Sequence, residues 1–320
     1  MGVTKYLWHG MRRSILRDVY GVATNYVPTF ILGIQRISDM RIPARIPLLV
    51  MLAMVAFAAN SLLCRMALKN TAIDAGSFTA IRITSGAAML WLVVRLRGLS
   101  HVPAGSWLSA LALFVYAAGF SFAYVKLPAA VGALILFGAV QATMIGCGLW
   151  RGERMGWVKI AGFCAAFAGL IALLLPGLSA PSSASAALML AAGIAWGIYS
   201  LRGKGWGDPV AATAGNFLRA VPFTALVYVF GFCDASLDSA GIWYAVVSGA
   251  LASGVGYVLW YAALPGLKAT HAATIQLSVP VIAAVGGVAL LGETITLRLL
   301  LSSAGILGGI ALVIMSKEAA

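Results

Sequence analysis

Residues 150–163 read WRGERMGWVKIAGF, and residues 290–303 read LLGETITLRLLLSS. In each stretch a Gly-Glu pair separates two long apolar runs, and the glutamates are Glu153 and Glu293. The offset of 140 residues between them aligns further identical pairs: Ala133 with Ala273, Ile135 with Ile275, Gly146 with Gly286 and Gly169 with Gly309. A chain that repeats itself in this way is predicted to fold as two related halves.

The composition indicates a membrane protein. Of the 320 residues, 62% are hydrophobic and 10% are charged, and the mean hydropathy is +0.97. A water-soluble protein of this length needs a much larger charged surface, whereas helices that face lipid need none. A helix crosses a bilayer with about 20 apolar residues. The sequence therefore predicts an all-α polytopic protein with ten transmembrane helices, over residues 46–68, 74–95, 104–124, 128–150, 156–176, 185–203, 209–231, 239–264, 269–291 and 299–316.

The two halves are predicted to be inverted relative to each other. Each half would hold five helices, residues 46–177 and residues 185–316, and an odd number of crossings turns the second half upside down. The first 45 residues are basic and interrupted by polar residues, and we expect them to form a tail outside the fold. Inverted repeats of this kind hold a substrate near the middle of the bilayer, between the halves.

The positive charge predicts an orientation in the membrane. The chain has 22 Lys and Arg against 9 Asp and Glu, a net charge of +13. Such a charge suggests a nucleic-acid partner for a soluble protein, but in a membrane protein basic residues gather in cytoplasmic loops. Placing both termini in the cytoplasm puts most of the basic residues inside. We therefore expect a multi-pass protein of the cell inner membrane, monomeric, with the lipid bilayer and a small-molecule substrate as partners and no nucleic acid.

One long stretch resembles a known family. Residues 256–313, GYVLWYAALPGLKATHAATIQLSVPVIAAVGGVALLGETITLRLLLSSAGILGGIALV, look like the second EamA-type repeat of the drug/metabolite transporter superfamily. The shared features are an aromatic pair in the eighth helix, Pro280 in the ninth, Leu-Gly-Glu and a glycine-rich last helix. The first half resembles the pattern more weakly, since Val140 stands where the second half has Pro280. The resemblance implies ten helices, metabolite export, and a central cavity lined by helices 1, 3, 4, 6, 8 and 9.

Polar and aromatic residues on these helices are the candidate substrate ligands. Asn60, Gln141 and Gln276 carry amides that lipid does not solvate, so they should face the interior. Aromatic residues follow one face of the eighth run at helical spacing. Helix packing alone explains any one of these positions, but together they suit an uncharged or zwitterionic solute with an apolar side chain. The predicted cavity residues are Asn60, Tyr116, Gln141, Trp196, Tyr199, Tyr257, Trp260 and Gln276.

Four charged residues are predicted to be structural. Glu153 and Glu293 should lie in the first turn of the helix that follows each of them, at the positive end of its dipole, with Arg298 within reach of the second. For Arg82 and Arg219, which recur between the halves, the first interpretation is a scaffold role with hydrogen bonds to backbone carbonyls. The second is the binding of a substrate carboxylate. No acid falls in the middle of a predicted helix, which argues against proton-driven efflux of cations.

An enzyme is the less favoured class. LASGVG at residues 251–256 has the Ser-Gly of intramembrane serine proteases, but Ser253 has no candidate base closer than His271, which begins the next helix. The four cysteines lack metal-site spacing and should be small core residues, so we predict no catalytic residue, metal or cofactor. The predicted function is export of small metabolites by alternating access, with amino acids, aromatic or otherwise neutral, favoured. The alternatives are efflux of nucleosides or of drugs and toxic compounds by the same fold, and, from another class, an intramembrane enzyme or a passive membrane scaffold.

Overall fold

The structure is a computed structural model that describes residues 42–98, 104–150, 156–175, 181–203, 207–230, 235–267 and 275–315. The chain divides into two units, residues 1–49 and residues 50–320, and the second unit is described below. The predicted tail up to residue 41 lies outside the described residues, and so does Glu153.

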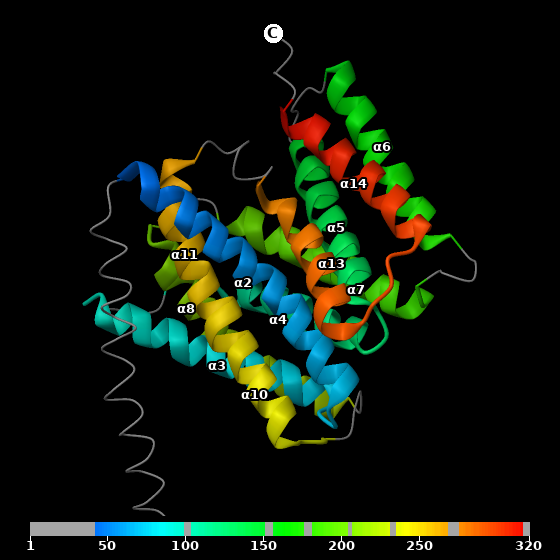
Figure 1. The fold of residues 1–320 in the computed structure, drawn as a ribbon. Helices are drawn as coiled ribbons and strands as arrows, with labels where there is room; N and C mark the ends of the chain where they lie inside the picture. Colours follow the sequence, from blue (N-terminus) through cyan, green and yellow to red (C-terminus); the bar gives the residue numbers. More distant parts are fainter. Residues whose placement is uncertain are drawn as a thin grey trace, which may run out of the picture. The chain divides into compact units, whose positions relative to one another are not determined.

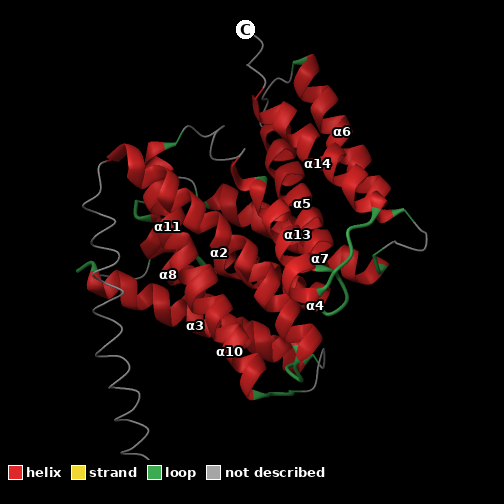
Figure 2. Ribbon diagram, viewed as in Figure 1, coloured by secondary structure: helices red, strands yellow, loops and turns green. Residues whose placement is uncertain are grey.

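The described chain is helical, with no strand in these ranges (Figure 2). Nine of its helical stretches are long and apolar enough to cross a membrane, and α13, with 14 residues, is a shorter apolar helix. The prediction of an all-helical polytopic membrane protein is confirmed. Figure 1 labels the main helices, which are α2 (Ile42–Asn70), α3 (Ala75–Leu96), α4 (Trp107–Tyr124), α5 (Ala129–Trp150), α6 (Trp157–Leu174), α7 (Ser183–Arg202), α8 (Pro209–Ala220), α10 (Ser239–Val247), α11 (Gly256–Ala263), α13 (Ser278–Leu291) and α14 (Leu297–Met315).

Short polar side chains fix where several helices begin. The carboxylate of Asp74 accepts from the Ser77 N–H at 2.9 Å and starts α3. Asp208 accepts from two N–H groups in the first turn of α8, at 2.8 and 3.2 Å. Ser106 accepts from the Ser109 N–H at 3.1 Å and starts α4. Each contact satisfies a backbone donor that has no partner inside its helix, which matters most beside lipid.

Two of the spanning stretches are interrupted. The seventh contains Pro222, which lacks an N–H, and it continues after α8 as the 3-10 turn η1 (Pro222–Ala225) and the short α9 (Leu226–Val229). The eighth contains a π-helical segment, η2 (Ser248–Val255), between α10 and α11. A side chain at Gly249 would collide with the carbonyl oxygen of Arg82, so this glycine lets η2 pack directly on α3.

The helices that end the two predicted halves pack against each other. These helices, α6 and α14, lie side by side in Figure 1. A Cβ atom at Gly162 would lie 2.6 Å from the Gly309 carbonyl oxygen, and one at Gly169 would lie 3.0 Å from that of Ser302. The offset of 140 residues makes Ser302 the counterpart of Gly162 and Gly309 the counterpart of Gly169. The contact is therefore reciprocal and antiparallel, as expected for two copies related by a two-fold axis in the membrane plane.

The outer surface is apolar, and tryptophans mark helix ends. Trp107, Trp150 and Trp157 stand at the first or last residue of their helices and are 59%, 92% and 82% exposed. Tryptophan prefers the boundary between lipid and water, so these residues fit membrane interfaces. The expectation that the cysteines are core residues holds for Cys64, which is buried, and is wrong for Cys164, which is exposed on α6 because that helix is mostly uncovered.

Candidate substrate cavity

The bundle encloses a cavity of about 380 Å³. This volume falls within the range of small-molecule sites, about 300–1,000 Å³. Its walls contain every residue that the sequence analysis assigned to a cavity: Asn60, Tyr116, Gln141, Trp196, Tyr199, Tyr257, Trp260 and Gln276. The structure thus brings these residues together around one space, and their role as substrate ligands stays a prediction.

Aromatic rings form the main wall. Trp196 of α7 stands at the centre of the cluster, with its ring centroid 4.7 Å from Tyr116, 5.2 Å from Tyr199 and 5.4 Å from Tyr257. Tyr199 and Tyr257 stack nearly parallel to it, at 24° and 23°. Phe57 of α2 extends this wall, with its ring centroid 5.7 Å from that of Tyr257. Rings arranged in this way can contact a flat or branched apolar group, because an aromatic ring packs favourably through both its face and its edge.

A polar cluster stands where α2, α3, α4 and η2 meet. The Ser248 hydroxyl donates to Asn60 Oδ1 at 2.6 Å, and Asn60 Nδ2 donates to the Tyr116 hydroxyl at 3.4 Å. Arg82 Nη2 donates to the same hydroxyl at 3.0 Å. The guanidinium also lies over two rings, 5.3 Å from the centroid of Tyr116 and 4.7 Å from that of Phe120. Arg82 is 2% exposed, so its charge lies just behind the cavity wall.

Arg82 and Arg219 differ in their partners. Arg219 donates to the Gly215 and Ala104 carbonyl oxygens, at 3.0 and 3.1 Å, as the scaffold interpretation expects. Arg82 instead donates to a side chain of the cavity wall. Its Nη1 is buried and has no hydrogen-bond partner within the described ranges. The carbonyl contacts that the scaffold interpretation predicted are therefore wrong for Arg82, whose guanidinium donates to a hydroxyl instead.

A second polar group in the wall was missed by the sequence analysis. Asn216 and Thr213 of α8 line the cavity, although the seventh helix was not expected to contribute to it. Asn216 Nδ2 donates to the Tyr199 hydroxyl at 3.4 Å, and that hydroxyl lies 3.5 Å from Thr213 Oγ1. The signal was present, because Asn216 is an amide in an apolar helix one turn after Thr213. The same reasoning that selected Asn60 would have found it.

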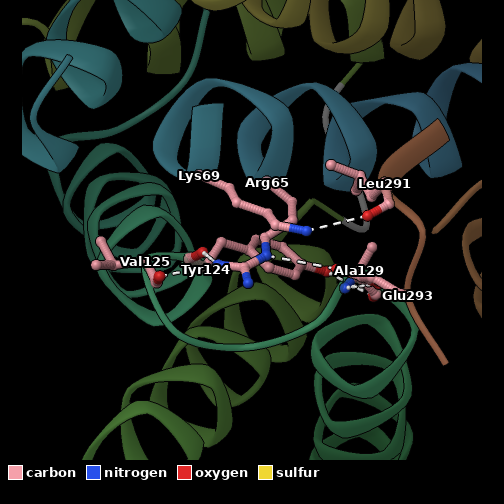
Figure 3. A network of polar contacts seen from close by, with 7 residues as sticks. All are labelled: Arg65, Lys69, Tyr124, Val125, Ala129, Leu291 and Glu293. Carbon is pink, nitrogen blue, oxygen red and sulfur yellow. Dashed lines mark hydrogen bonds and ion pairs between the residues drawn. The ribbon is translucent and has the colours of Figure 1, made fainter. Parts of the chain in front are cut away.

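A network of polar contacts lies at the end of the bundle away from Gly203 and Pro209, where it joins α2, α4, α5 and the segment after α13 (Figure 3). Arg65 Nη1 donates to the carbonyl oxygens of Tyr124 and Val125, both at 2.8 Å, and Nε lies 3.4 Å from Glu293 Oε1. Glu293 Oε2 accepts from the Ala129 N–H at 2.8 Å, at the first residue of α5. We call these residues, with Lys69 and Leu291, the Arg65 network.

The position predicted for Glu293 is wrong. The following helix, α14, begins at Leu297, so Glu293 is not in its first turn. Gly292 adopts φ +63°, a conformation that favours glycine, and the Glu293 N–H then donates back to the Gly287 carbonyl oxygen at 3.0 Å. This turn directs the carboxylate to the start of α5. The Gly-Glu pair therefore ends one helix and caps another.

The cavity and the Arg65 network occupy different ends of the bundle. Cavity-lining residues include Gly203, which follows α7, Pro209, which begins α8, and Leu264, which follows α11. The cavity thus extends to that end, and no residue of the Arg65 network lines it. The lining residues in the described part of the chain carry no charge. The described acids lie outside the cavity wall, and each accepts a hydrogen bond at the start of a helix. These acids are Asp74, Asp208, Asp238 and Glu293.

A bundle of membrane-length helices around an aromatic cavity, with the reciprocal antiparallel contact of α6 and α14, is typical of a secondary membrane transporter. The chain belongs to the EamA-like transporter family, whose model matches residues 183–315. It is a transporter and not an enzyme, so the intramembrane enzyme alternative is excluded. The predicted resemblance to an EamA-type protein of the drug/metabolite transporter superfamily is confirmed.

Several known proteins are similar to this chain. An uncharacterized protein of Pseudomonas aeruginosa is 57% identical over 84% of this chain and 94% of its own length. An uncharacterized transporter of Archaeoglobus fulgidus is 29% identical, over 52% of this chain and 60% of the relative. A probable terminal-alkyne amino-acid exporter of Streptantibioticus cattleyicolor is 27% identical, over 53% of this chain and 58% of the relative. One crystal structure shares the fold, with a TM-score of 0.60 and 20% identity, covering 84% of this chain and 96% of that one.

Proposed function

We propose that this protein exports neutral amino acids, aromatic or otherwise apolar, from the cytoplasm by alternating access. The observation that carries the proposal is the cavity: about 380 Å³, walled by aromatic rings, amides and hydroxyls, with no charge among its described lining residues. Rings such as Trp196 and Tyr257 accommodate an apolar side chain. Amides such as those of Asn60 and Gln141, and hydroxyls such as that of Tyr116, accommodate the ammonium and carboxylate groups.

The arrangement of the two ends supports alternating access. Residues 46–177 and 185–316 form the two moving halves in this proposal, in the inner membrane with both termini in the cytoplasm. In that orientation the Arg65 network closes the outer end, while the cavity extends to the inner end. The described conformation is then the one that takes up substrate from the cytoplasm. The similarity to a probable terminal-alkyne amino-acid exporter supports an amino-acid substrate.

Counterflow in proteoliposomes tests the proposal. Purified protein is reconstituted into liposomes loaded with unlabelled phenylalanine, and uptake of labelled phenylalanine is measured, with uridine assayed in parallel. We expect phenylalanine counterflow well above that of protein-free liposomes. Trp196→Ala, which removes the central ring of the wall, should abolish it without changing the amount of folded protein. Uridine flux without phenylalanine flux would replace the substrate by a nucleoside, and flux of neither would refute the proposed substrate.

A further inference from the structure

Arg82 carries a buried positive charge that no carboxylate neutralises within the described ranges. It is 2% exposed, and its Nη1 has no hydrogen-bond partner there. Buried donors are almost always paired, and an unpaired donor on a charged group is especially unfavourable. Arg219 of the second half provides the contrast, because two carbonyl oxygens satisfy it. A guanidinium that is not neutralised directly behind a cavity wall favours an anionic group on the cavity side of that wall.

Tyr116 connects this charge to the cavity. Its hydroxyl oxygen accepts from Arg82 Nη2 at 3.0 Å and from Asn60 Nδ2 at 3.4 Å. An oxygen with two donors directed at it has its own proton available for a further acceptor. Tyr116 and Asn60 both line the cavity. The phenol therefore presents a donor to the cavity, strengthened by the cation behind it.

We propose that Tyr116, Asn60 and Arg82 form the subsite that binds the carboxylate of the substrate. The inference rests on the proposed function and adds to it a location and a sign of charge. Tyr116 donates to the carboxylate directly, and Arg82 supplies the positive charge that the uncharged wall lacks. The neighbouring ring of Trp196, 4.7 Å from that of Tyr116, then contacts the apolar side chain. The site selects against cations, because a positive ligand group would meet Arg82 without a carboxylate between them.

Matched ligands test the charge preference. Labelled phenylalanine counterflow is challenged with phenylalaninamide and phenethylamine, which lack the carboxylate, and with 3-phenylpropionate, which lacks the ammonium group. The same ligands are added to purified protein in thermal-unfolding measurements, which require no transport. We expect 3-phenylpropionate to compete and to raise the unfolding temperature. Phenylalaninamide and phenethylamine should compete at least about tenfold more weakly, since a hydrogen bond to a charged group is lost.

Variants locate the subsite. Tyr116→Phe removes one hydroxyl and keeps the ring, and we expect it to raise the KM for phenylalanine about tenfold. The weak competition by phenethylamine, which has no carboxylate, should stay unchanged in this variant. If the hydroxyl had only a structural role, its loss would weaken both ligands alike. Arg82→Gln should abolish the preference for carboxylate ligands, and Arg82→Lys should restore part of it. Tyr228→Phe is the control, because it removes a hydroxyl bonded to Ser77 at 2.8 Å, outside the cavity wall.

The outcomes separate this subsite from the proposed function. Phenylalanine flux that phenethylamine inhibits as well as 3-phenylpropionate does would overturn the subsite and leave amino-acid export standing. Absence of flux, with carboxylate-dependent stabilisation that Tyr116→Phe abolishes, would overturn the substrate and leave the subsite standing. Neither flux nor stabilisation would overturn both. If Arg82→Gln does not fold, the comparison of Tyr116→Phe with Tyr228→Phe still decides the question.

Discussion

The Arg65 network should hold one end of the bundle closed, and Glu293→Gln should open it. The side chains of Arg65 and Glu293 are 12% and 10% exposed, so the pair is poorly screened by water. It connects α2 to the segment after α13, while Glu293 Oε2 also accepts from the first N–H of α5 at 2.8 Å. These elements have to separate if the cavity is to reach this end. Glutamine keeps the size of the side chain and removes its charge.

The expected magnitude follows from this geometry. Exposed ion pairs contribute at most about 1 kcal/mol, and breaking a fully buried pair costs about 3–5 kcal/mol. The separation of 3.4 Å between Arg65 Nε and Glu293 Oε1 is long, and Arg65 keeps its two carbonyl acceptors. Breaking this pair should therefore cost about 1 kcal/mol, the value for an exposed pair. Adding a weakened helix cap, about 0.5–1 kcal/mol, gives a loss of about 2 kcal/mol for the closed arrangement. The ratio of open to closed protein should then rise about 30-fold.

Cysteine labelling measures this ratio. Ser61 lines the cavity one turn before Arg65, and Ser61→Cys is placed in a background without the four native cysteines. A membrane-impermeant maleimide is added on the side of Glu293, and Glu293→Gln should increase the labelling rate about 30-fold. Lys126→Gln is the control, because it removes an exposed charge from the segment between α4 and α5, at the same end of the bundle. Equal rates in Glu293→Gln and the parent would refute a closing role for the network.

Three further outcomes are expected. Gln276→Ala should lower phenylalanine counterflow with unchanged thermal unfolding, whereas loss of flux together with unfolding would make this amide structural. A proton gradient should not be needed for export, because the described acids cap helices and none lines the cavity; dependence of vesicle flux on the gradient would contradict this. Gly309→Ala should lower the unfolding temperature, because its Cβ would lie 2.5 Å from the Ala166 N atom. Gly308→Ala should not lower it, because a Cβ there would have no atom within 4 Å. Equal effects of the two substitutions would refute the glycine contact between α6 and α14.

The fold could be predicted from the sequence because a bilayer permits few solutions. Long apolar runs become helices, since the backbone has no other partner in lipid. The repeat around Glu153 and Glu293 also predicted an inverted second half, which stays a prediction. The reciprocal contacts of Gly162 with Gly309 and of Gly169 with Ser302 are the contacts that such a symmetry would produce. Cavity residues could be selected for a related reason, because amides and hydroxyls in apolar helices avoid lipid.

Partners of charged side chains could not be predicted, because they depend on distances between helices. Spacing along the chain suggested Arg298 as the neighbour of Glu293, but the partner is Arg65, which is 228 residues away. The positive φ of Gly292 turns the carboxylate away from its own helix, and nothing in the sequence states which helix start it will meet. The symmetry between Arg82 and Arg219 was equally misleading. These two positions, which the sequence aligns in the predicted halves, have different neighbours: a hydroxyl for Arg82 and carbonyls for Arg219.

The position of Arg82 behind the wall suits a protein that has to release what it binds. A guanidinium projecting into an apolar cavity would be poorly solvated when no substrate is bound, and it would hold a carboxylate tightly once paired. Here the faces of Tyr116 and Phe120, at 5.3 and 4.7 Å, stabilise the cation in both situations. The substrate meets a polarised phenol in place of the charge itself. The site keeps its selectivity for a carboxylate, while the binding free energy that opposes release is smaller than for a direct ion pair. A variant that places the positive charge inside the cavity should therefore bind substrate more tightly and transport it more slowly.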